Sequence, residues 1–199
     1  MKRLWPGWLL CLVTAGLFAY MALVESAAIS ALLGGWQLPD GVPLGYDADA
    51  ARALFDVFVA DFSAAQVEGR QSASEAYLAL HAGFDLLFPP LLAMSIAFCA
   101  FAATYSRQDQ AETPRLAKVG LGLALALAFA YLGFDFFENA VADTIYGPKA
   151  IMLAFNEQMV FVLQVLTRGK YLSLIVAIVL IVALWIARRK RMRSTKADT

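Results

Sequence analysis

The sequence predicts an all-α membrane protein in which four transmembrane helices form a bundle, with short amphipathic helices on its outer surface. Of the 199 residues, 61% are hydrophobic and only 16% are charged, against roughly 25% charged in a typical soluble domain. The apolar residues come in unbroken runs, each near the roughly 20 residues that a helix needs to cross a bilayer. Strands of a membrane barrel are about half as long and alternate, so these runs favour helices.

A single transmembrane domain over residues 1–199 is natural at this length. Its apolar runs predict spans at about residues 5–34, 76–105, 117–139 and 169–188. The first run is interrupted only by Glu25. The fourth is long enough only if Lys170 and its neighbours extend their charged ends toward water.

Lysine and arginine residues predict the orientation. Eleven of the 16 lie before the first span, between the second and third, or after the fourth, in the tail at 188–199. The loop at 37–75, by contrast, carries seven acidic residues. Because basic residues accumulate on the cytoplasmic side, we expect a bacterial inner-membrane protein with both termini cytoplasmic and this loop outside.

The first span has an alternative interpretation. Residues 1–26 partly fit a cleaved secretory signal, with a basic start, an apolar stretch and Val24-Glu25-Ser26 before Ala27. The apolar stretch is long for that role, so we expect a retained span. Both cysteines, Cys11 and Cys99, lie inside apolar runs, which does not indicate a disulfide framework or a thiolate zinc site.

Two segments outside the spans have helical patterns. Phe55, Phe58, Val59 and Phe62 recur at helical spacing, which predicts a helix on the outer membrane surface or over the helix ends. Asp47 or Asp49 is expected to cap its start, and Ser72 with Glu75 forms a capping-box pattern for the second span. We expect the mostly apolar stretch at 148–169 to form a second surface helix that turns at Gly169 into the fourth span.

Ionisable residues inside the spans are the candidates for function, because charges are costly in lipid. At about 1.5 Å per residue, Glu25, Asp85, Asp135 and Glu138 all fall near the outer boundary of the hydrocarbon. Such residues on four helices could share one site. Helical spacing supports this prediction, since one face of the second span carries Tyr77, His81 and Asp85, and one face of the third carries Tyr131, Asp135, Asn139 and, by extension, Asp143.

These residues allow two interpretations. In a catalytic site, Asp135 and Glu138 would be an acid–base pair assisted by Asp85 and His81; the residues that would bind a ligand are Asn139, Tyr131, Tyr77, Lys170 and Glu25. Alternatively, the acids pair with Lys170 or Arg168 and hold the bundle together. His81, Asp85, Asp135 and Glu138 are suitable metal ligands, but they match no metal motif, so no metal ligand is predicted and the cofactor stays open.

Several of these pieces resemble an uncharacterised group of small four-helix bacterial membrane proteins. The shared features are Gly69-Arg70 followed by Tyr77, the run Asp85-Leu86-Leu87-Phe88-Pro89, the aspartate-x-x-glutamate-asparagine pattern at 135–139, and Thr167 with Lys170. The resemblance covers roughly residues 69–187. It implies the four-helix fold and these site residues, and it implies no activity.

The sequence therefore leaves three functions open. The first is a non-enzymatic component, either a partner subunit or a lipid-binding protein. The alternative is a membrane enzyme that acts on a lipid or another apolar molecule, and the third is a transporter of protons or small solutes. The expected partners are the bilayer, a lipid or apolar molecule and a homo- or hetero-oligomer, but no nucleic acid, since the net charge is zero. An open cavity lined by the acids would favour the enzyme, and a sealed ion pair would favour a structural role.

Overall fold

The computed structural model describes residues 4–104 and 115–197, with side chains through residue 190. Within these ranges the chain is helical and contains no strand. Its elements are α1 (Trp5–Tyr20), a π-helical turn η2 (Met21–Glu25), α2 (Ser26–Leu32), a 3₁₀ turn η3 (Pro39–Gly41), α3 (Ala48–Glu68), α4 (Ala73–Ala82), α5 (Phe84–Thr104), α6 (Arg115–Tyr146) and α7 (Glu157–Ala197).

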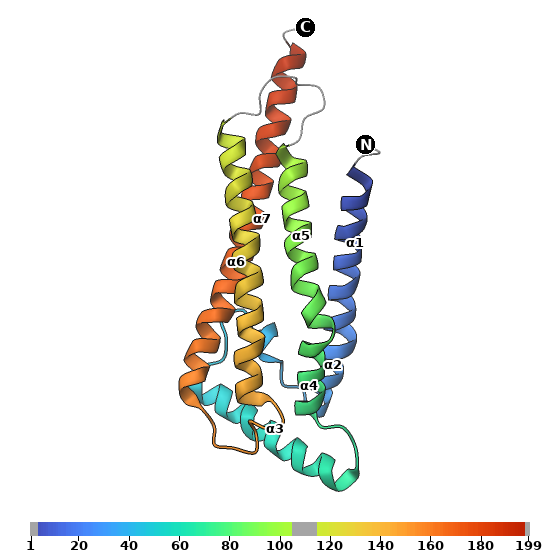
Figure 1. Ribbon diagram of the computed structural model, residues 1–199, viewed down its shortest axis with the longest axis vertical. Coiled ribbons are helices and arrows are strands. Elements are labelled where there is room, and N and C mark those ends of the chain that lie inside the picture. Colours follow the sequence, from blue (N-terminus) through green and yellow to red (C-terminus); the bar gives the residue numbers. More distant parts are fainter. Residues whose placement is uncertain (1–3, 105–114, 198–199) are drawn as a thin grey trace.

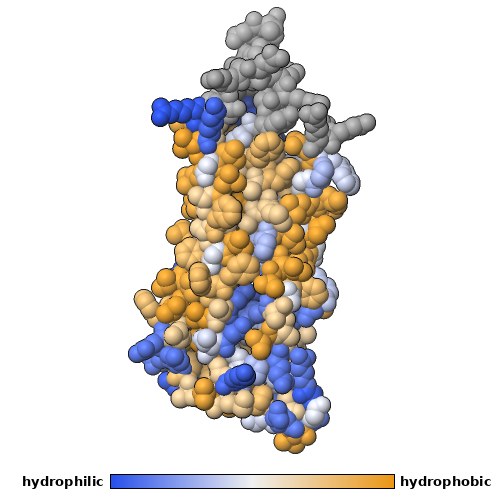
Figure 2. Space-filling model, viewed as in Figure 1, coloured by the Kyte–Doolittle hydropathy of each residue, from blue (hydrophilic) through white to orange (hydrophobic). Residues whose placement is uncertain are grey.

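Four segments are long and apolar enough to cross a membrane: Trp5–Leu32, Phe84–Thr104, Arg115–Tyr146 and Glu157–Lys190. Large apolar side chains on their outer faces are exposed, among them Leu12, Leu23, Phe129 and Val179. Figure 2 shows these hydrophobic surfaces along most of the bundle, with hydrophilic residues gathered toward the lower end. The predicted all-α bundle is confirmed, and it supports a multi-pass membrane protein.

The helices stand side by side, and α1 begins at the same end of the bundle at which α7 ends (Figure 1). At the opposite end α3 lies across the helix ends, and we call this the α3 end. Helices α5, α6 and α7 pack against one another, whereas α1 packs chiefly on α5. That contact includes a buried pair of hydroxyls, Thr14 Oγ1 and Ser95 Oγ, which lie 3.0 Å apart.

The core has two parts. Toward the end opposite to α3, small and branched residues of α5, α6 and α7 pack closely, including Ala100, Ala124 and Ala177, which are all fully buried. At the α3 end the core contains large aromatic side chains, with the Phe58 ring of α3 in tilted contact with the rings of both Tyr77 and Tyr146. The predicted amphipathic helix therefore packs over the helix ends through its Phe55–Phe62 face.

The predicted start signals are present. The Asp47 carboxylate accepts a hydrogen bond from the Ala50 N–H at 2.8 Å and caps α3, so Asp47 rather than Asp49 is the cap. Ser72 and Glu75 form the expected capping box at the start of α4. Between these helices, buried Asp61 accepts hydrogen bonds from the Arg70 guanidinium and the Ala73 N–H, which ties α3 to α4.

Two sequence expectations about helix boundaries are wrong. Residues 148–169 do not form a surface helix that turns at Gly169, because α7 begins at Glu157 and continues through that glycine. The missing side chain serves packing instead, since a Cβ at Gly169 would lie 2.8 Å from the Phe134 ring of α6. The second predicted span is divided at Gly83 into α4 and α5, whereas Pro89 and Pro90 lie inside α5.

Only some of the basic residues that predict the orientation lie within the described part of the chain. Lys2, Arg3 and Arg107 lie outside them, as do the side chains of the tail after residue 190. Arg115 and Lys118, at the start of α6, and Arg188, near the end of α7, are described and lie at the end opposite to α3. Arg188 donates a hydrogen bond to the Ala102 carbonyl of α5 at 2.7 Å.

Candidate functional site

An ion-pair cluster joins α6 to α7 near the α3 end. The Lys170 ammonium of α7 contacts carboxylates of Asp135 and Glu138, which lie one helical turn apart on α6. Its Nζ is 3.2 Å from Asp135 Oδ1. Glu138 is fully buried and also accepts a hydrogen bond from Thr167 Oγ1 at 2.5 Å. Tyr131 donates a longer bond of 3.5 Å to Asp135 Oδ1.

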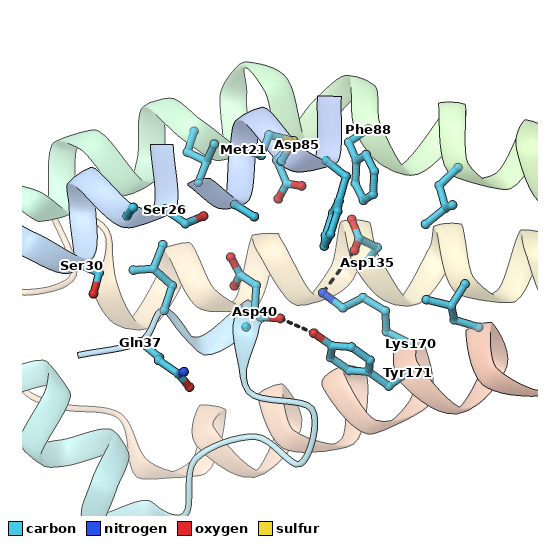
Figure 3. A pocket seen from close by; sticks show the side chains of 18 of the residues that line it. Met21, Ser26, Ser30, Gln37, Asp40, Asp85, Phe88, Asp135, Lys170 and Tyr171 are labelled. Atoms are coloured by element: carbon cyan, nitrogen blue, oxygen red, sulfur yellow. Dashed lines mark hydrogen bonds and ion pairs between the residues drawn. The ribbon is translucent and has the colours of Figure 1, made fainter. Parts of the chain in front are cut away.

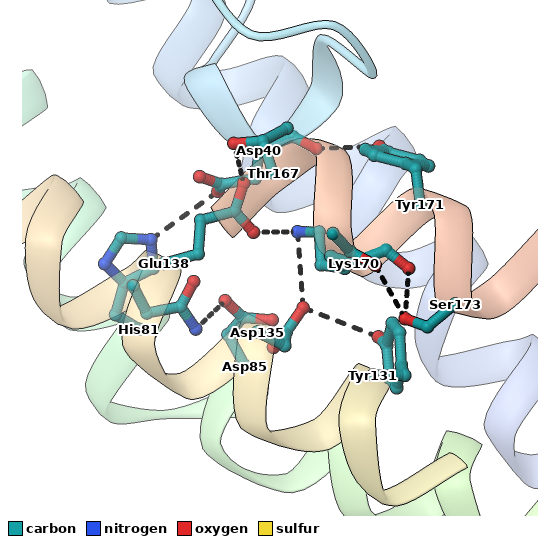
Figure 4. Close-up of polar contacts among 12 residues, drawn as sticks. Asp40, His81, Asp85, Tyr131, Asp135, Glu138, Thr167, Lys170, Tyr171 and Ser173 are labelled. Atoms are coloured by element: carbon teal, nitrogen blue, oxygen red, sulfur yellow. Dashed lines mark hydrogen bonds and ion pairs between the residues drawn. The ribbon is translucent and has the colours of Figure 1, made fainter. Parts of the chain in front are cut away.

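A second cluster lies beside it, around Asp40 of η3, His81 of α4 and Asp85 of α5 (Figure 4). Each residue offers an oxygen or nitrogen atom, and these three atoms lie within 4.8 Å of one another. His81 Nε2 is 3.5 Å from Asp40 Oδ2. We call Asp40, His81 and Asp85 the Asp40 triad.

Each member of the Asp40 triad has a hydrogen-bond partner outside the triad. Tyr77 Oη donates to Asp40 Oδ1 at 2.5 Å. The Nδ1 atom of His81 lies 2.7 Å from Asp143 Oδ1 of α6. These contacts fix the direction in which the Asp40 and His81 side chains point.

Asp85 is held in the same way by α6. Asn139 Nδ2 donates to Asp85 Oδ2 at 2.7 Å. Asn139 and Asp143 are one helical turn apart, so α6 supports both His81 and Asp85 from a single face. Two residues of the polar row predicted along the third span, Asn139 and Asp143, therefore orient two members of the Asp40 triad.

The contact between His81 and Asp40 changes the acidity of both groups. Burial alone would raise the pKa of Asp40, but the neighbouring His81 and the more distant Lys170 charge lower it to about 2. Burial alone would lower the pKa of His81, but Asp143 and Asp40 raise it to about 10. Burial and the Asp40 charge raise the pKa of Tyr77 well above its ordinary value. In the ligand-free protein His81 is therefore an imidazolium between two carboxylates.

Negative charge is in excess here. Among the residues that the structure describes, the two clusters hold carboxylates of Asp40, Asp85, Asp135 and Glu138, and only two cationic groups, Lys170 and His81. Asp143, on the far side of His81, adds a further carboxylate. Uncompensated charge away from water is costly, so this region favours an additional cation or protons.

Both clusters border a cavity of about 490 Å³. Its polar wall contains Asp40, Asp85, Asp135 and Lys170, whose charged groups point into it (Figure 3). The apolar wall is formed by side chains of α1, η2, α5 and α7, namely Phe18, Met21, Phe88, Leu92 and Leu174. The cavity is not sealed, because Ala22 and Ala27 on its α1–α2 side are exposed.

The predicted site residues divide into two groups. Tyr77, His81, Asp85, Tyr131, Asp135, Glu138, Asn139 and Lys170 are brought together in the two clusters. Glu25 is not: its carboxylate accepts a hydrogen bond from Tyr20 at 2.7 Å on the exposed surface. Arg168, the alternative partner for the acids, donates to the Leu44 carbonyl instead.

Asp40 is not among the site residues predicted from the sequence. It lies in a Pro-Asp-Gly turn outside every predicted span, and an acid in such a turn normally indicates only a loop. In the structure the η3 turn folds back toward the bundle, and the Asp40 carbonyl accepts a hydrogen bond from Tyr171 Oη at 2.8 Å. Sequence periodicity cannot predict this contact, because Asp40 and Tyr171 are far apart in the chain.

The residues of the pattern that suggested a family are close together in space. Asp85, Asp135, Glu138 and Asn139 belong to the two clusters, and Thr167 supports one of them. No protein-family model, curated protein or solved structure matches this chain. The bundle is consistent with the small four-helix fold that the resemblance implies.

Proposed function

We propose that this protein is a multi-pass protein of a bacterial inner membrane that binds a lipid-like, amphipathic molecule in the cavity. The observation that carries the proposal is the division of the cavity wall into a charged part and a larger apolar part. Such a division suits a molecule with a polar end and a hydrocarbon tail. A volume of about 490 Å³ lies within the range of roughly 300–1,000 Å³ found for small-molecule sites.

An unpaired atom supports a polar ligand. Asp135 Oδ2 is buried and has no hydrogen-bond partner among the residues that the structure describes. Buried polar atoms normally have a partner, so this oxygen favours a donor supplied by a bound molecule. The charge excess also sets a condition on that molecule: an anionic polar end would require a cation beside it.

The charge distribution supports the route of entry. The basic residues of α6 and α7 described above lie at the end opposite to α3, which would place that end in the cytoplasm with both termini. The cavity would then lie in the outer half of the membrane. A lipid of the outer leaflet could reach it past the exposed Ala22 and Ala27.

Photolabelling tests this proposal. The protein would be reconstituted in nanodiscs with a phosphatidylethanolamine that carries a diazirine on its acyl chain, and the labelled peptides would be mapped. We expect label on the cavity residues Phe88, Leu92 or Leu174, and strong loss of that label in Ala27→Trp, which fills the cavity mouth. The matched control is Ala126→Trp, an exposed site on α6 away from the cavity. Equal labelling in both variants would contradict a cavity site.

A membrane enzyme is the second candidate, and the Asp40 triad is the observation that favours it. The assignment of an acid–base pair to Asp135 and Glu138 is less suitable, because Glu138 is fully buried against Lys170 and Thr167 and does not line the cavity. Asp40 and Asp85 do line it. Their position beside His81 offers groups that a bound substrate could touch.

A further inference from the structure

The ion contacts of the Asp40 triad leave one buried atom, Nε2 of His81, without a hydrogen bond. His81 is only 6% exposed, yet its Nε2 atom has no hydrogen-bond partner among the described residues. This nitrogen faces Asp40 Oδ2 at 3.5 Å without making a hydrogen bond. Release of its proton on metal binding would make this buried ring nitrogen, which faces Asp40, a donor atom for a metal ion.

The hydrogen bonds behind the three side chains leave one donor atom free on each. Asp143 engages the other ring nitrogen of His81, Tyr77 engages Asp40 Oδ1, and Asn139 engages Asp85 Oδ2. The three residues come from separate elements, η3, α4 and α5, and one ligand atom of each lies within 4.8 Å of the other two. Histidine ligands of metals usually have this feature, because a carboxylate on the far nitrogen fixes the ring and makes it more basic.

The distances suit a small divalent ion. With bonds of about 2.1 Å, two ligands of a tetrahedral zinc lie roughly 3.4 Å apart. The 3.5 Å between His81 Nε2 and Asp40 Oδ2 is close to that edge. The third ligand atom, from Asp85, lies within 4.8 Å of both, so a small movement of its carboxylate toward them would complete the set.

We propose that Asp40, His81 and Asp85 bind one divalent transition-metal ion of the zinc class. One imidazole and two carboxylates are ligands that such ions accept. When His81 coordinates the ion as a neutral imidazole, Lys170 and the dication together offset three of the four negative charges of Asp40, Asp85, Asp135 and Glu138. Asp40 and Asp85 both line the cavity, so the fourth coordination position would face it.

This metal site deepens the proposed function, on which its role toward a bound lipid rests. A metal with one open position could hold an oxygen of the polar end of an amphipathic molecule. The metal ion would then be the cation that an anionic end requires next to these carboxylates. Metal binding itself does not need a lipid and can be measured without one.

Zinc titration is the first test. The full chain would be purified in detergent, stripped with a chelator and titrated with Zn²⁺ by calorimetry. We expect one ion per chain, and a loss of affinity of at least about tenfold in Asp40→Asn, Asp85→Asn and His81→Gln. Asp143→Asn, which alters only the residue behind His81, should lose about tenfold as well. The matched control is Asp56→Asn, an exposed acid of α3 that should keep the wild-type affinity.

A measurement on the wild-type protein tests the metal site even if the variants fail to fold. X-ray absorption at the zinc edge of the wild-type complex should show one imidazole nitrogen and otherwise oxygen ligands. An all-oxygen shell, a stoichiometry that does not saturate, or undiminished affinity in both His81→Gln and Asp85→Asn would overturn the proposal. Zinc binding without photolabelling of the cavity would leave the metal site standing and reject the lipid site; labelling without zinc binding would do the reverse.

Discussion

Nζ of Lys170 lies 3.2 Å from Oδ1 of Asp135, where α7 crosses α6 in the interior of the bundle. Lys170 is only 7% exposed, and its second partner, Glu138, is fully buried. Removing two charges from water is costly, so the net stabilisation from such a pair is small. The cost of breaking it is large, because the remaining charges are then buried without a counterion.

We therefore expect Lys170→Met to lower the free energy of unfolding by about 3 kcal/mol or more. Two neighbouring carboxylates would be left without their cation. The triple change of Lys170→Met with Asp135→Asn and Glu138→Gln should recover most of that loss, because no uncompensated charge remains. Thermal unfolding in detergent would measure both.

The control for this comparison is Lys149→Met, which removes an exposed lysine and should change stability by less than about 0.5 kcal/mol. If Lys170→Met were as stable as this control, the ion pairs would have no structural role. Asp135 and Glu138 would then have to be protonated, or paired with a cation other than Lys170.

The capping box at the start of α4 predicts a pH dependence. The N–H of Ser72 donates to Glu75 Oε2 at 2.9 Å, and its hydroxyl donates to the same oxygen. These hydrogen bonds lower the pKa of Glu75 below its ordinary value of 4.5. A lowered pKa in the folded state stabilises the protein above pH 4.5, and that stabilisation is lost as the pH falls through the folded-state pKa.

We accordingly expect the wild type to unfold at a higher temperature than Glu75→Gln at neutral pH, and the difference to shrink as the pH falls below about 4.5. Glutamine keeps an oxygen for the Ser72 N–H but carries no charge. Unfolding temperatures between pH 3 and 7 would show this. A pH-independent difference would mean that the hydrogen bonds matter and the charge does not.

The sequence predicted the fold because the signals that determine it are local. Unbroken apolar runs, the Ser72–Glu75 spacing and the Phe55–Phe62 stripe all depend on residues close in the chain. The turn predicted at Gly169 failed for the opposite reason. A glycine indicates a break when only its neighbours are considered, but here it allows α7 to approach Phe134 of α6.

The candidate site was predicted only in part, and the same distinction explains why. Helical spacing was enough to place Tyr77 and His81 on one face and Asp135 and Asn139 on another. It could not show that Asp40 meets His81, because that contact joins residues 41 positions apart through a loop. Glu25 was expected at the same depth, but depth does not specify which way a side chain points, and Glu25 bonds to Tyr20 on the surface.

The hydroxyl pair between α1 and α5 gives a third prediction. Thr14 and Ser95 are both buried, and their oxygens lie 3.0 Å apart. Hydrogen bonds between membrane helices are worth about 0.6 kcal/mol on average. A double-mutant cycle of Thr14→Val and Ser95→Ala, measured by unfolding in detergent, should give a coupling energy of that size. A coupling near zero would show that this hydroxyl pair does not help to hold α1, and with it one wall of the cavity, against α5.

The last prediction concerns Tyr171, whose hydroxyl donates to the Asp40 carbonyl at 2.8 Å and ties the η3 turn to α7. Tyr171→Phe removes this hydrogen bond and leaves the Asp40 carboxylate and its bond from Tyr77 in place. One lost hydrogen bond of about 1 kcal/mol corresponds to roughly fivefold in affinity. We therefore expect Tyr171→Phe to weaken Zn²⁺ binding by about that factor, less than Asp40→Asn does.

The matched control is Tyr20→Phe, because the Tyr20 hydroxyl bonds to Glu25 on the surface and touches neither cluster. It should bind Zn²⁺ with wild-type affinity in the same calorimetric titration. Equal affinities for the two variants would mean that the hydrogen bond from Tyr171 is not needed to position Asp40. A loss confined to Tyr171→Phe would instead show that the turn must be fixed to α7 for Asp40 to reach the metal. Of the two hydroxyls removed, only that of Tyr171 bonds to a residue of the Asp40 triad.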